Sequence, residues 1–421
     1  MALSKKPVTG MKDILPSEML IRDYVTGLVK DTYRSFGFTP IETPAVEHID
    51  NLLSKQGGEN EKLIFKILKR GEKLVLDGDV TEDGLADSGL RYDLTLPLSR
   101  FYACHSAQLP APFKALQIGP VWRADRPQKG RFRQFVQCDI DVLGEATNLA
   151  EIELITATTT LLSKLDLDDL TVRINDRRIL RAMAASCGFD EADHDRVFII
   201  LDKMDKIGIE GVRQELIESG FDEKAAKAYT DLFDTDGKKP SLSELSQKLE
   251  GYLEEGCAKN LSEIIESVEK VKNADFDIVF DPTLVRGMSY YTGTIFEIEM
   301  NGFGSSIAGG GRYDEMIGKF TGNKVCACGF SIGFERIITI LEDRGFKAPD
   351  TSSPKAFLIE KGADAEFVSS VIKEANALRA KGQCVLVAMM NKNKKFQKEQ
   401  LENDGFSSDN IKEFYHTDLK N

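Results

Sequence analysis

Residues 122–141 read WRADRPQKGRFRQFVQCDID, and this stretch decides which fold the sequence predicts. A Pro-Gln-Lys-Gly turn separates two stretches of strand-like composition, which predicts an antiparallel hairpin. Five cations crowd around the turn, and like charges so close repel one another unless an anion lies among them. They are Arg123, Arg126, Lys129, Arg131 and Arg133. A solvated basic loop is the alternative, because charge runs are usually surface features.

The second predicted strand carries polar side chains along one face. Successive side chains on a strand point to opposite faces, so one face takes every second residue of this stretch. That face is predicted to hold Arg131, Arg133, Phe135, Gln137, Asp139 and Asp141. Arginines at a strand end, followed by polar groups on the same face, predict a site for a triphosphate beside a polar small molecule.

Further strand-like stretches lie on both sides of the hairpin. KLIFKIL comes before it, and LTVRIND, FDIVFD, TIFEIEM and CACGFSIG come after it. Residues 38–49, FTPIETPAVEHI, predict an extended strand interrupted by Pro40 and Pro44, preceded by an amphipathic helix over about 17–36. Strands paired antiparallel across loops, with helices outside them, predict an α+β fold.

The character of the chain changes twice after residue 176. Residues 177–272 carry charged amphipathic patterns without strand signals, which predicts a helical insertion into a main body of residues 1–176 and 273–345. Residues 346–354 have the Gly, Pro and Ser content of a linker. Residues 355–421 predict a small α/β domain that begins strand, helix, strand, and no further strand is predicted after about residue 390.

Composition excludes several classes of protein. The chain has 421 residues, 42% of them hydrophobic, with 68 acidic residues against 55 basic ones. This excess of acid argues against a nonspecific nucleic-acid binder held by phosphate contacts, although a local basic groove can act on an acidic protein. Seven scattered cysteines without a CxxC pair, and only four histidines, predict no structural metal site. No stretch has the length of a signal-peptide core or a membrane span, so a cytoplasmic protein is expected.

Three other segments carry residues suited to chemistry. LVRGMSYYTGTIFEIE places Arg286 shortly before Tyr290 and Tyr291, and the glycines at 309–311 let a backbone approach a ligand closely. GFSIGFERI, at 329–337, places Arg336 in the first turn of a predicted helix, where the helix dipole disfavours a cation unless an anion faces it. The glycines lack the spacing of a Rossmann or P-loop site, so neither is predicted.

Together and in this order, these segments resemble the histidyl-tRNA synthetases. GFTPIETPAVE, WRADRPQKGRFRQF and GFSIGFERI resemble motifs 1, 2 and 3 of class II aminoacyl-tRNA synthetases. RGMSYYTGTIFE and AGGGRYD resemble the two histidine signatures of the family, and LRYDLTLPLSR resembles its substrate-lining segment. The resemblance covers about residues 8–345, and the joint occurrence is far more specific than any single motif.

The resemblance implies a class II antiparallel-sheet catalytic domain that activates L-histidine with ATP and Mg²⁺ and passes it to tRNA(His). It implies that ATP is held by Arg123, Asp125, Arg131 and Arg336, and that histidine is surrounded by Asp93, Thr95, Gln137, Asp141, Tyr290 and Tyr291. Arg286 would lie between the histidine carboxylate and the α-phosphate, and with Arg123 it would stabilise the charge that develops there. A homodimer is also implied, because motif 1 usually helps form the interface.

Two alternatives stay open on the sequence. Residues 355–421 resemble only the first half of the family's anticodon-binding domain, so an enzyme that passes histidine to an acceptor other than tRNA is one alternative. The other is a catalytically inactive relative, similar to the synthetase-like regulatory subunit of ATP phosphoribosyltransferase. Loss of the ATP arginines or of the histidine signatures would mark that relative, and the sequence retains both.

Overall fold

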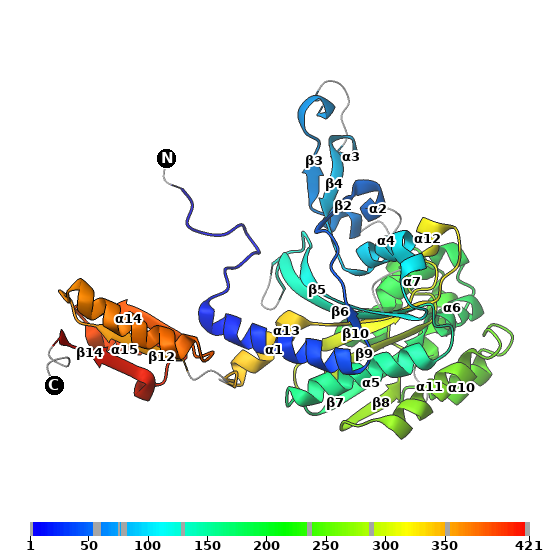
Figure 1. Ribbon diagram of the computed structural model, residues 1–421. Helices are drawn as coiled ribbons and strands as arrows, with labels where there is room; N and C mark the ends of the chain where they lie inside the picture. The colour runs from blue at the N-terminus through cyan, green and yellow to red at the C-terminus, as the bar shows by residue number, and fades with distance from the viewer. Residues whose placement is uncertain are drawn as a thin grey trace. The chain divides into compact units, whose positions relative to one another are not determined.

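The larger part of the chain is organised around a mixed β-sheet (Figure 1). The computed structural model describes residues 3–53, 60–74, 76, 82–127, 131–233, 238–285, 290–349 and 354–416. In these residues the sheet has eight strands, in the order β1 (Thr39–Pro40), β5 (Phe113–Trp122), β6 (Gln134–Leu143), β11 (Ala327–Ile332), β10 (Ser306–Arg312), β9 (Thr294–Met300), β7 (Leu170–Asp176) and β8 (Phe276–Phe280). Neighbouring strands are antiparallel except β1 with β5 and β7 with β8. The α+β class predicted from the sequence is confirmed.

The predicted hairpin forms, but its second strand starts later than the pattern predicted. β5 pairs with β6 from Phe113 opposite Leu143 to Trp122 opposite Gln134. Arg131 and Arg133 precede the strand, so the prediction that they share its polar face is wrong. Arg133 instead donates its backbone N–H to the carbonyl of Gly10 at 2.7 Å and its Nε to the carbonyl of Asp125 at 3.0 Å. These two bonds hold the backbone at the entrance to β6.

β6 is buried on both faces, with different chemistry on each. Cys138, Ile140 and Val142 point to one face and are at most 3% exposed. Burying each large apolar side chain stabilises the fold by roughly 1.5–3 kcal/mol, so this row anchors the strand. Helix α5 (Leu149–Lys164) packs against β6 and β11. The row of Gln137, Asp139 and Asp141 on the other face is thereby held on rigid backbone.

Residues 38–49 form two short strands in place of the single extended strand predicted. β1 lies at the edge of the large sheet, whereas β2 (Val46–His48) pairs with β4 (Ala86–Leu90), which pairs in turn with β3 (Lys66–Leu68). Pro40 and Pro44 explain the break, because proline has no N–H to donate to a neighbouring strand. Short helices α2 (Ile49–Leu53) and α3 (Glu82–Leu85) accompany this small sheet.

The described residues between 177 and 271 fold mainly as a series of helices, in agreement with the helical pattern of the sequence. Three of these helices are capped by side chains that accept from the first turn: Asp176 from Arg178, Asp222 from Ala225, and Ser241 from Glu244. The series comprises α6 (Arg177–Ser186), α7 (His194–Leu201), α8 (Met204–Glu218), α9 (Glu223–Asp231), α10 (Leu242–Lys248) and α11 (Cys257–Val271). α11 packs against α5, β7 and β8. The boundaries of a separate insertion domain stay a prediction.

The remaining helices of this part include α4 (Thr95–His105), α12 (Gly318–Thr321) and α13 (Phe334–Asp343). Single turns of 3₁₀ helix occur as well, at Asn60–Leu63, Gly71–Lys73, Ser106–Gln108 and Glu191–Asp193, and near the end of the chain at Ser408–Asn410. No helix within the described part of the chain is long and apolar enough to cross a membrane.

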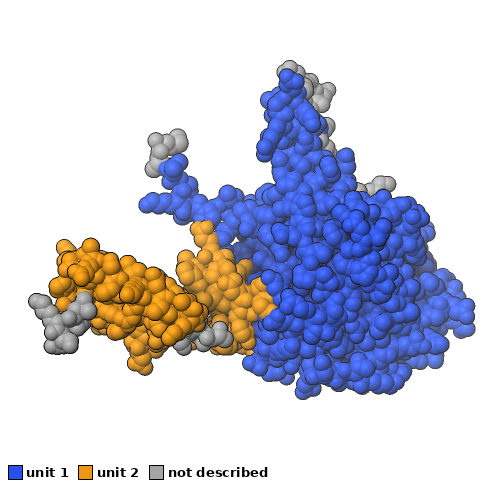
Figure 2. Space-filling model, in the orientation of Figure 1, with its two compact units in different colours: residues 1–12, 28–340 blue, residues 13–27, 341–421 orange. Residues whose placement is uncertain are grey.

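The chain divides into two compact units (Figure 2). Residues 1–12 and 28–340 form the larger unit, and residues 13–27 and 341–421 form the smaller one. The first part of α1 (Pro16–Ser35) therefore belongs to the smaller unit, where the rings of Tyr24 and Phe346 lie 5.5 Å apart. The linker and domain boundaries inferred from composition are a finer division, and they stay predictions.

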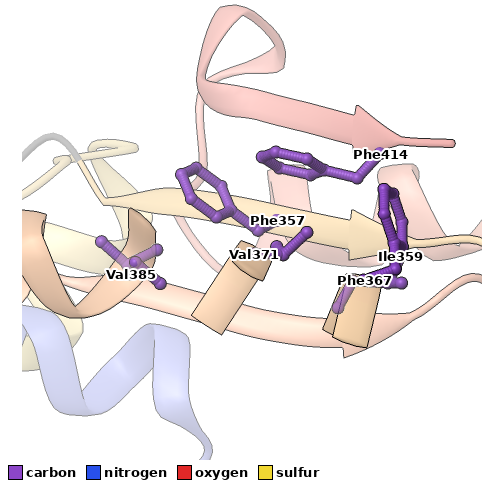
Figure 3. Close-up of a cluster of buried hydrophobic side chains, with 7 residues drawn as sticks. Phe357, Ile359, Phe367, Val371, Val385 and Phe414 are labelled. Carbon is purple, nitrogen blue, oxygen red and sulfur yellow. The ribbon is translucent and has the colours of Figure 1, made fainter. Parts of the chain in front are cut away.

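The smaller unit contains a parallel sheet in the order β13 (Val385–Met389), β12 (Lys355–Ile359), β14 (Ile411–Phe414). The prediction that no strand follows residue 390 is wrong, because β14 pairs with β12. Its sequence IKEF is only four residues long and does not alternate apolar with charged residues, so it gives a weak strand signal. Helix α14 (Ala365–Arg379) packs on one apolar cluster of this sheet (Figure 3). Helix α15 (Lys394–Asn403) supplies Leu401 to a second cluster.

Candidate active site

A pocket of about 310 Å³ lies beside the central strands of the large sheet. Its floor includes the polar row of β6, together with residues of β10 and β11. The segment entering α4, the segment leaving β5 and the first turn of α13 also line it. This volume is within the range of cavities that hold small ligands.

The pocket gathers residues that lie far apart in the sequence. Every site residue predicted from the sequence and described in the structure lines it: Asp93, Thr95, Arg123, Asp125, Arg131, Gln137, Asp141, Tyr290, Tyr291 and Arg336. Arg286, to which the central role was assigned, lies outside the described residues, in the segment 286–289. Lys129 of the predicted turn also lies outside them, in the segment 128–130. The structure thus brings the other candidates together, and their individual roles stay predictions.

One end of the pocket is built around Asp141. The Tyr313 hydroxyl donates to Asp141 Oδ1 at 2.6 Å, and both residues are almost fully buried. Gly329, opposite Asp141 on β11, makes room for this carboxylate, because a Cβ at that position would lie 2.0 Å from Oδ1. The rings of Tyr290 and Tyr313 lie 6.0 Å apart and wall the same end.

The glycines of β10 also serve close packing. A Cβ on Gly310 would lie 2.0 Å from the carbonyl oxygen of Gly329, so the two strands could not approach with a side chain there. A Cβ on Gly311 would lie 2.5 Å from the Thr294 carbonyl oxygen. Gly309 lines the pocket itself. The glycine run was expected to let the backbone approach a ligand closely. In the structure it mainly lets neighbouring strands approach each other.

Three buried polar oxygens beside the pocket have no hydrogen-bond partner among the described residues. They are Asp93 Oδ2, Gln137 Oε1 and Asp141 Oδ2. The other oxygen of Asp93 accepts from the backbone N–H of Leu96 at 3.1 Å. Buried polar atoms are normally paired, so three unpaired acceptors around one cavity indicate a ligand that donates several hydrogen bonds.

Burial raises the pKa of the carboxyl groups in this pocket. Loss of solvent raises the pKa of Asp139 to about 7, and it also raises the pKa of Asp93 and of Asp141. The proximity of Asp139 adds to the rise for Asp141. Carboxylates that share a low-dielectric site cannot all ionise easily without a cation beside them. This part of the pocket is therefore suited to a cationic group such as an ammonium.

The opposite character appears where the arginines line the pocket. The Arg123 guanidinium lies 4.3 Å from the centre of the Tyr92 ring and 5.1 Å from that of Phe135, and its Nε donates to the Tyr92 carbonyl at 3.2 Å. Stacking between rings orients the guanidinium with little freedom. Arg336 donates to the carbonyl of Ser306, and Arg131 is exposed beside the pocket. Several fixed cations suit a polyanion such as a triphosphate.

Sequence reasoning assigned no role to several residues that the structure places in the pocket. Tyr313 lies within the AGGGRYD signature, and its bond to Asp141 could not be inferred without the pairing of β10 and β11. Asp139 was predicted to share the face of Gln137 and Asp141, and it lines the pocket with them. Glu335 accepts from the backbone N–H of Val136 at 3.1 Å, which ties α13 to β6.

The described residues contain no group of three or more His, Cys, Asp or Glu side chains placed to hold a metal ion. Asp125 and Glu335 are the acidic residues that line the pocket near the arginines. This arrangement fits a cation that is held largely by the oxygens of a bound polyphosphate, as Mg²⁺ often is.

Comparisons with known proteins agree with this geometry. The family model described as "Histidyl-tRNA synthetase" matches residues 10–337. A histidine–tRNA ligase of Leifsonia xyli is 48% identical over 367 residues, or 83% of each chain. A probable histidine–tRNA ligase of Tropheryma whipplei is 41% identical over 420 residues, which covers 96% of this chain and 94% of the relative.

Solved structures give the same result at lower identity. A histidyl-tRNA synthetase from Nostoc sp. PCC 7120 superposes with a TM-score of 0.74 at 28% identity and covers 96% of this chain and 90% of its own. A Bacillus halodurans protein, described as an ATP phosphoribosyltransferase regulatory subunit/histidyl-tRNA synthetase, has a TM-score of 0.73 at 21% identity and covers 98% of each chain. At that identity the second likeness shows the fold alone.

Proposed function

Because the chain belongs to the histidyl-tRNA synthetase family, we propose that its pocket is the site at which histidine and ATP react. The protein is a histidine–tRNA ligase, a class II aminoacyl-tRNA synthetase. It activates L-histidine with ATP to give histidyl-adenylate and diphosphate, and it transfers the histidyl group to tRNA(His) with release of AMP. The observation that carries the proposed site is the joint lining of one cavity by the ATP and histidine candidates.

The histidine end of the proposed site is the polar end of the pocket. Imidazole has one donor and one acceptor nitrogen, and Asp141 with a tyrosine hydroxyl can pair with both. Asp93, Thr95 and Gln137 would take the α-ammonium group, for which the unpaired Asp93 Oδ2 and Gln137 Oε1 are suitable acceptors. Tyr290 and Tyr291 would enclose the ring. An amino acid without the imidazole nitrogens would leave Asp141 unpaired in a buried site, which discriminates strongly against it.

The ATP end of the proposed site is the arginine-lined end. Arg123, Arg131 and Arg336 would hold the phosphates, and Asp125 would line the same end. ATP is the second substrate, and Mg²⁺ bound to its phosphates would neutralise part of their charge. We propose that Asp125 and Glu335 are the acidic side chains near enough to support that ion.

Activation needs positioning and cations more than proton transfer. The histidine carboxylate is already ionised, so its oxygen can attack the α-phosphorus directly; the new O–P bond forms as the bond to the diphosphate breaks. Arg123, and Arg286 by the resemblance, would stabilise the negative charge that builds on the α-phosphate oxygens. In the second step a hydroxyl of the tRNA terminus attacks the activated carbonyl carbon, and AMP leaves.

The test is histidine-dependent exchange of labelled diphosphate into ATP, followed by charging of total tRNA with labelled histidine. Both activities are expected, and Arg286→Ala should remove exchange. Failure of the wild-type chain to exchange would contradict the proposed site and favour the regulatory-subunit alternative. Exchange without charging would favour an acceptor other than tRNA.

We further propose a cytoplasmic homodimer. The location follows from the use of charged tRNA in protein synthesis. The dimer rests on the motif 1 resemblance of residues 37–47, which contain β1 and the start of β2. Light scattering should give twice the monomer mass of 46.8 kDa, and a monomeric mass would contradict the dimer.

A further inference from the structure

Asp139 lies in the middle of the polar row of β6, between Gln137 and Asp141, and it is only 3% exposed. It lines the pocket, yet the roles proposed above leave it without a task. On the neighbouring strand β11, Ser331 stands directly opposite Asp139. The contacts among Asp139, Gln137 and Ser331 define what the carboxylate does.

The side-chain nitrogen of Gln137 is surrounded by acceptors. Gln137 Nε2 donates to both oxygens of Asp139, each at 3.4 Å, and to the Ser331 hydroxyl at 3.3 Å. The opposite orientation of the amide would set Gln137 Oε1 against a carboxylate, where two acceptors repel. Asp139 thereby selects one of the two amide orientations. In that orientation Gln137 Oε1 is buried beside the pocket with no partner among the described residues.

Some buried carboxylates elsewhere in the larger unit are paired with arginine. Glu151 bonds Arg312 at 2.7 Å, and Asp281 bonds Arg173 at 2.6 Å. Within the described chain, no ion pair involves Asp139. An unpaired buried carboxylate destabilises a fold, so its presence calls for a compensating cation from elsewhere. Burial accordingly raises the pKa of Asp139 to about 7.

We propose that Asp139 is a positioning residue for the amino-acid substrate, which orients Gln137 so that its Oε1 accepts from the α-ammonium group and which adds negative charge beside that group. This inference rests on the proposed function, since it places histidine at the polar end of the pocket. It adds a determinant of α-ammonium recognition to the residues inferred from the family resemblance. The charged or titratable groups that act on Asp139, or on which it acts, are Asp93, Arg123, Arg91, Asp141, Tyr33 and Cys138.

Three variants of the full-length chain separate geometry from charge. Asp139→Ala removes both the acceptor and the charge. Asp139→Asn keeps an oxygen that can accept from Gln137 Nε2 but removes the charge. Ser331→Ala tests the neighbouring hydroxyl, which accepts from the same nitrogen and also hydrogen-bonds Asp139.

The measurement is diphosphate exchange, with KM for histidine and KM for ATP determined separately between pH 6 and 8.5. Asp139→Ala should raise KM for histidine about tenfold or more, the range of a hydrogen bond to a charged group, with KM for ATP within about twofold. Asp139→Asn should raise KM for histidine by a smaller factor. The ratio of its histidine KM to the wild-type histidine KM should grow as pH rises, because only the wild-type carboxyl becomes charged in that range. Titration of the substrate imidazole cancels in this ratio.

A deaminated substrate provides the second readout. The inhibitor 3-(imidazol-4-yl)propionate lacks the α-ammonium group, so Asp139→Asn should leave its inhibition constant within about twofold of wild type. An unchanged KM for histidine in Asp139→Ala overturns the inference, and so does an equal loss of affinity for the deaminated inhibitor. If Asp139→Ala does not fold, Asp139→Asn decides by the same two criteria. Absence of exchange in the wild type would instead contradict the proposed function.

Discussion

β6 and β12 are both central strands buried on both faces, yet they bury different chemistry. In β12, Phe357 and Ile359 pack beneath α14, and Ala356 and Leu358 lie in the cluster that includes Leu401 of α15. In β6, one face is apolar and the other presents Asp139 and Asp141 to a pocket. Apolar burial stabilises by about 25 cal/mol per Å², whereas burying an unpaired carboxylate costs free energy. Of these two equally buried strands, β6 with its buried polar side chains therefore serves function, and β12 with its apolar side chains serves stability.

The largest effect that would sharpen this comparison is expected from Arg123→Ala. Removal of a cation stacked between Tyr92 and Phe135 should lower diphosphate exchange on the order of 10³-fold, about 4 kcal/mol in transition-state stabilisation. The thermal midpoint should change little by comparison. Arg126→Ala is the control, because Arg126 is exposed on the same segment and does not line the pocket. Equal losses in the two variants would show that general positive charge, and not the geometry of Arg123, is responsible.

The counterpart in the apolar strand is Phe357→Ala. Phe357 is 2% exposed and its ring centre lies 4.8 Å from that of Phe414, so truncation should destabilise the smaller unit by about 3–5 kcal/mol. Amide hydrogen exchange of peptides from residues 355–416 would detect this destabilisation. The rate of diphosphate exchange into ATP should stay within about twofold of wild type. Phe396→Ala, at a side chain 54% exposed, should change stability by less than about 0.5 kcal/mol. Parallel loss of diphosphate exchange in Phe357→Ala would break the distinction between the two strands.

A smaller effect is expected from Gly329→Ala, which acts on the polar strand through its neighbour. The added Cβ would lie 2.0 Å from Asp141 Oδ1, so the carboxylate must move away from its place beside Tyr313. KM for histidine should rise on the order of 100-fold, because a displacement of about 1 Å is costly at a reacting site. Gly27→Ala is the control. Gly27 lies in α1 with no atom within 4 Å of the added carbon, so KM for histidine should stay at the wild-type value. A histidine KM close to wild type in Gly329→Ala would mean that Asp141 does not contact the substrate.

The remaining expectation concerns the stability cost of the polar row. The pKa of Asp139 is raised from 3.8 to about 7, so the folded state holds its proton more tightly than the unfolded state. Its contribution to stability is complete below about pH 4 and is lost as pH rises through about 7, to a limit of about 4 kcal/mol. Asp139→Asn does not titrate, so its free energy of unfolding relative to wild type should increase between pH 5 and pH 8.

Urea unfolding at the two pH values tests this expectation, because it gives the free energy of unfolding directly. Between pH 5 and pH 8, the free energy of unfolding of Asp139→Asn relative to wild type should rise by about 1 to 4 kcal/mol. That rise, together with weaker histidine binding, would show that Asp139 lowers stability in favour of function. A relative stability independent of pH would mean that Asp139 is ionised normally in the folded protein.

Local patterns predicted much of the fold and failed where pairing partners decide. The turn at 127–130 and the strand composition around it predicted the β5–β6 hairpin, because a hairpin is a local structure. The start of β6 was misplaced, since the strand begins at Gln134 and the Arg133 N–H donates to the carbonyl of Gly10, which is distant in sequence. β14 was missed because IKEF becomes a strand only beside β12, which is more than fifty residues earlier.

The sequence by itself determined the family and the α+β class, and it supplied a set of candidate site residues, because the motifs keep residue types at spacings that local structure imposes. Only the tertiary structure decided that Tyr313 donates to Asp141, that Gly329 leaves space for that carboxylate, and that Asp139 orients Gln137. These contacts join β6, β10 and β11 across long sequence separations, and their register is set by sheet pairing that no single segment encodes.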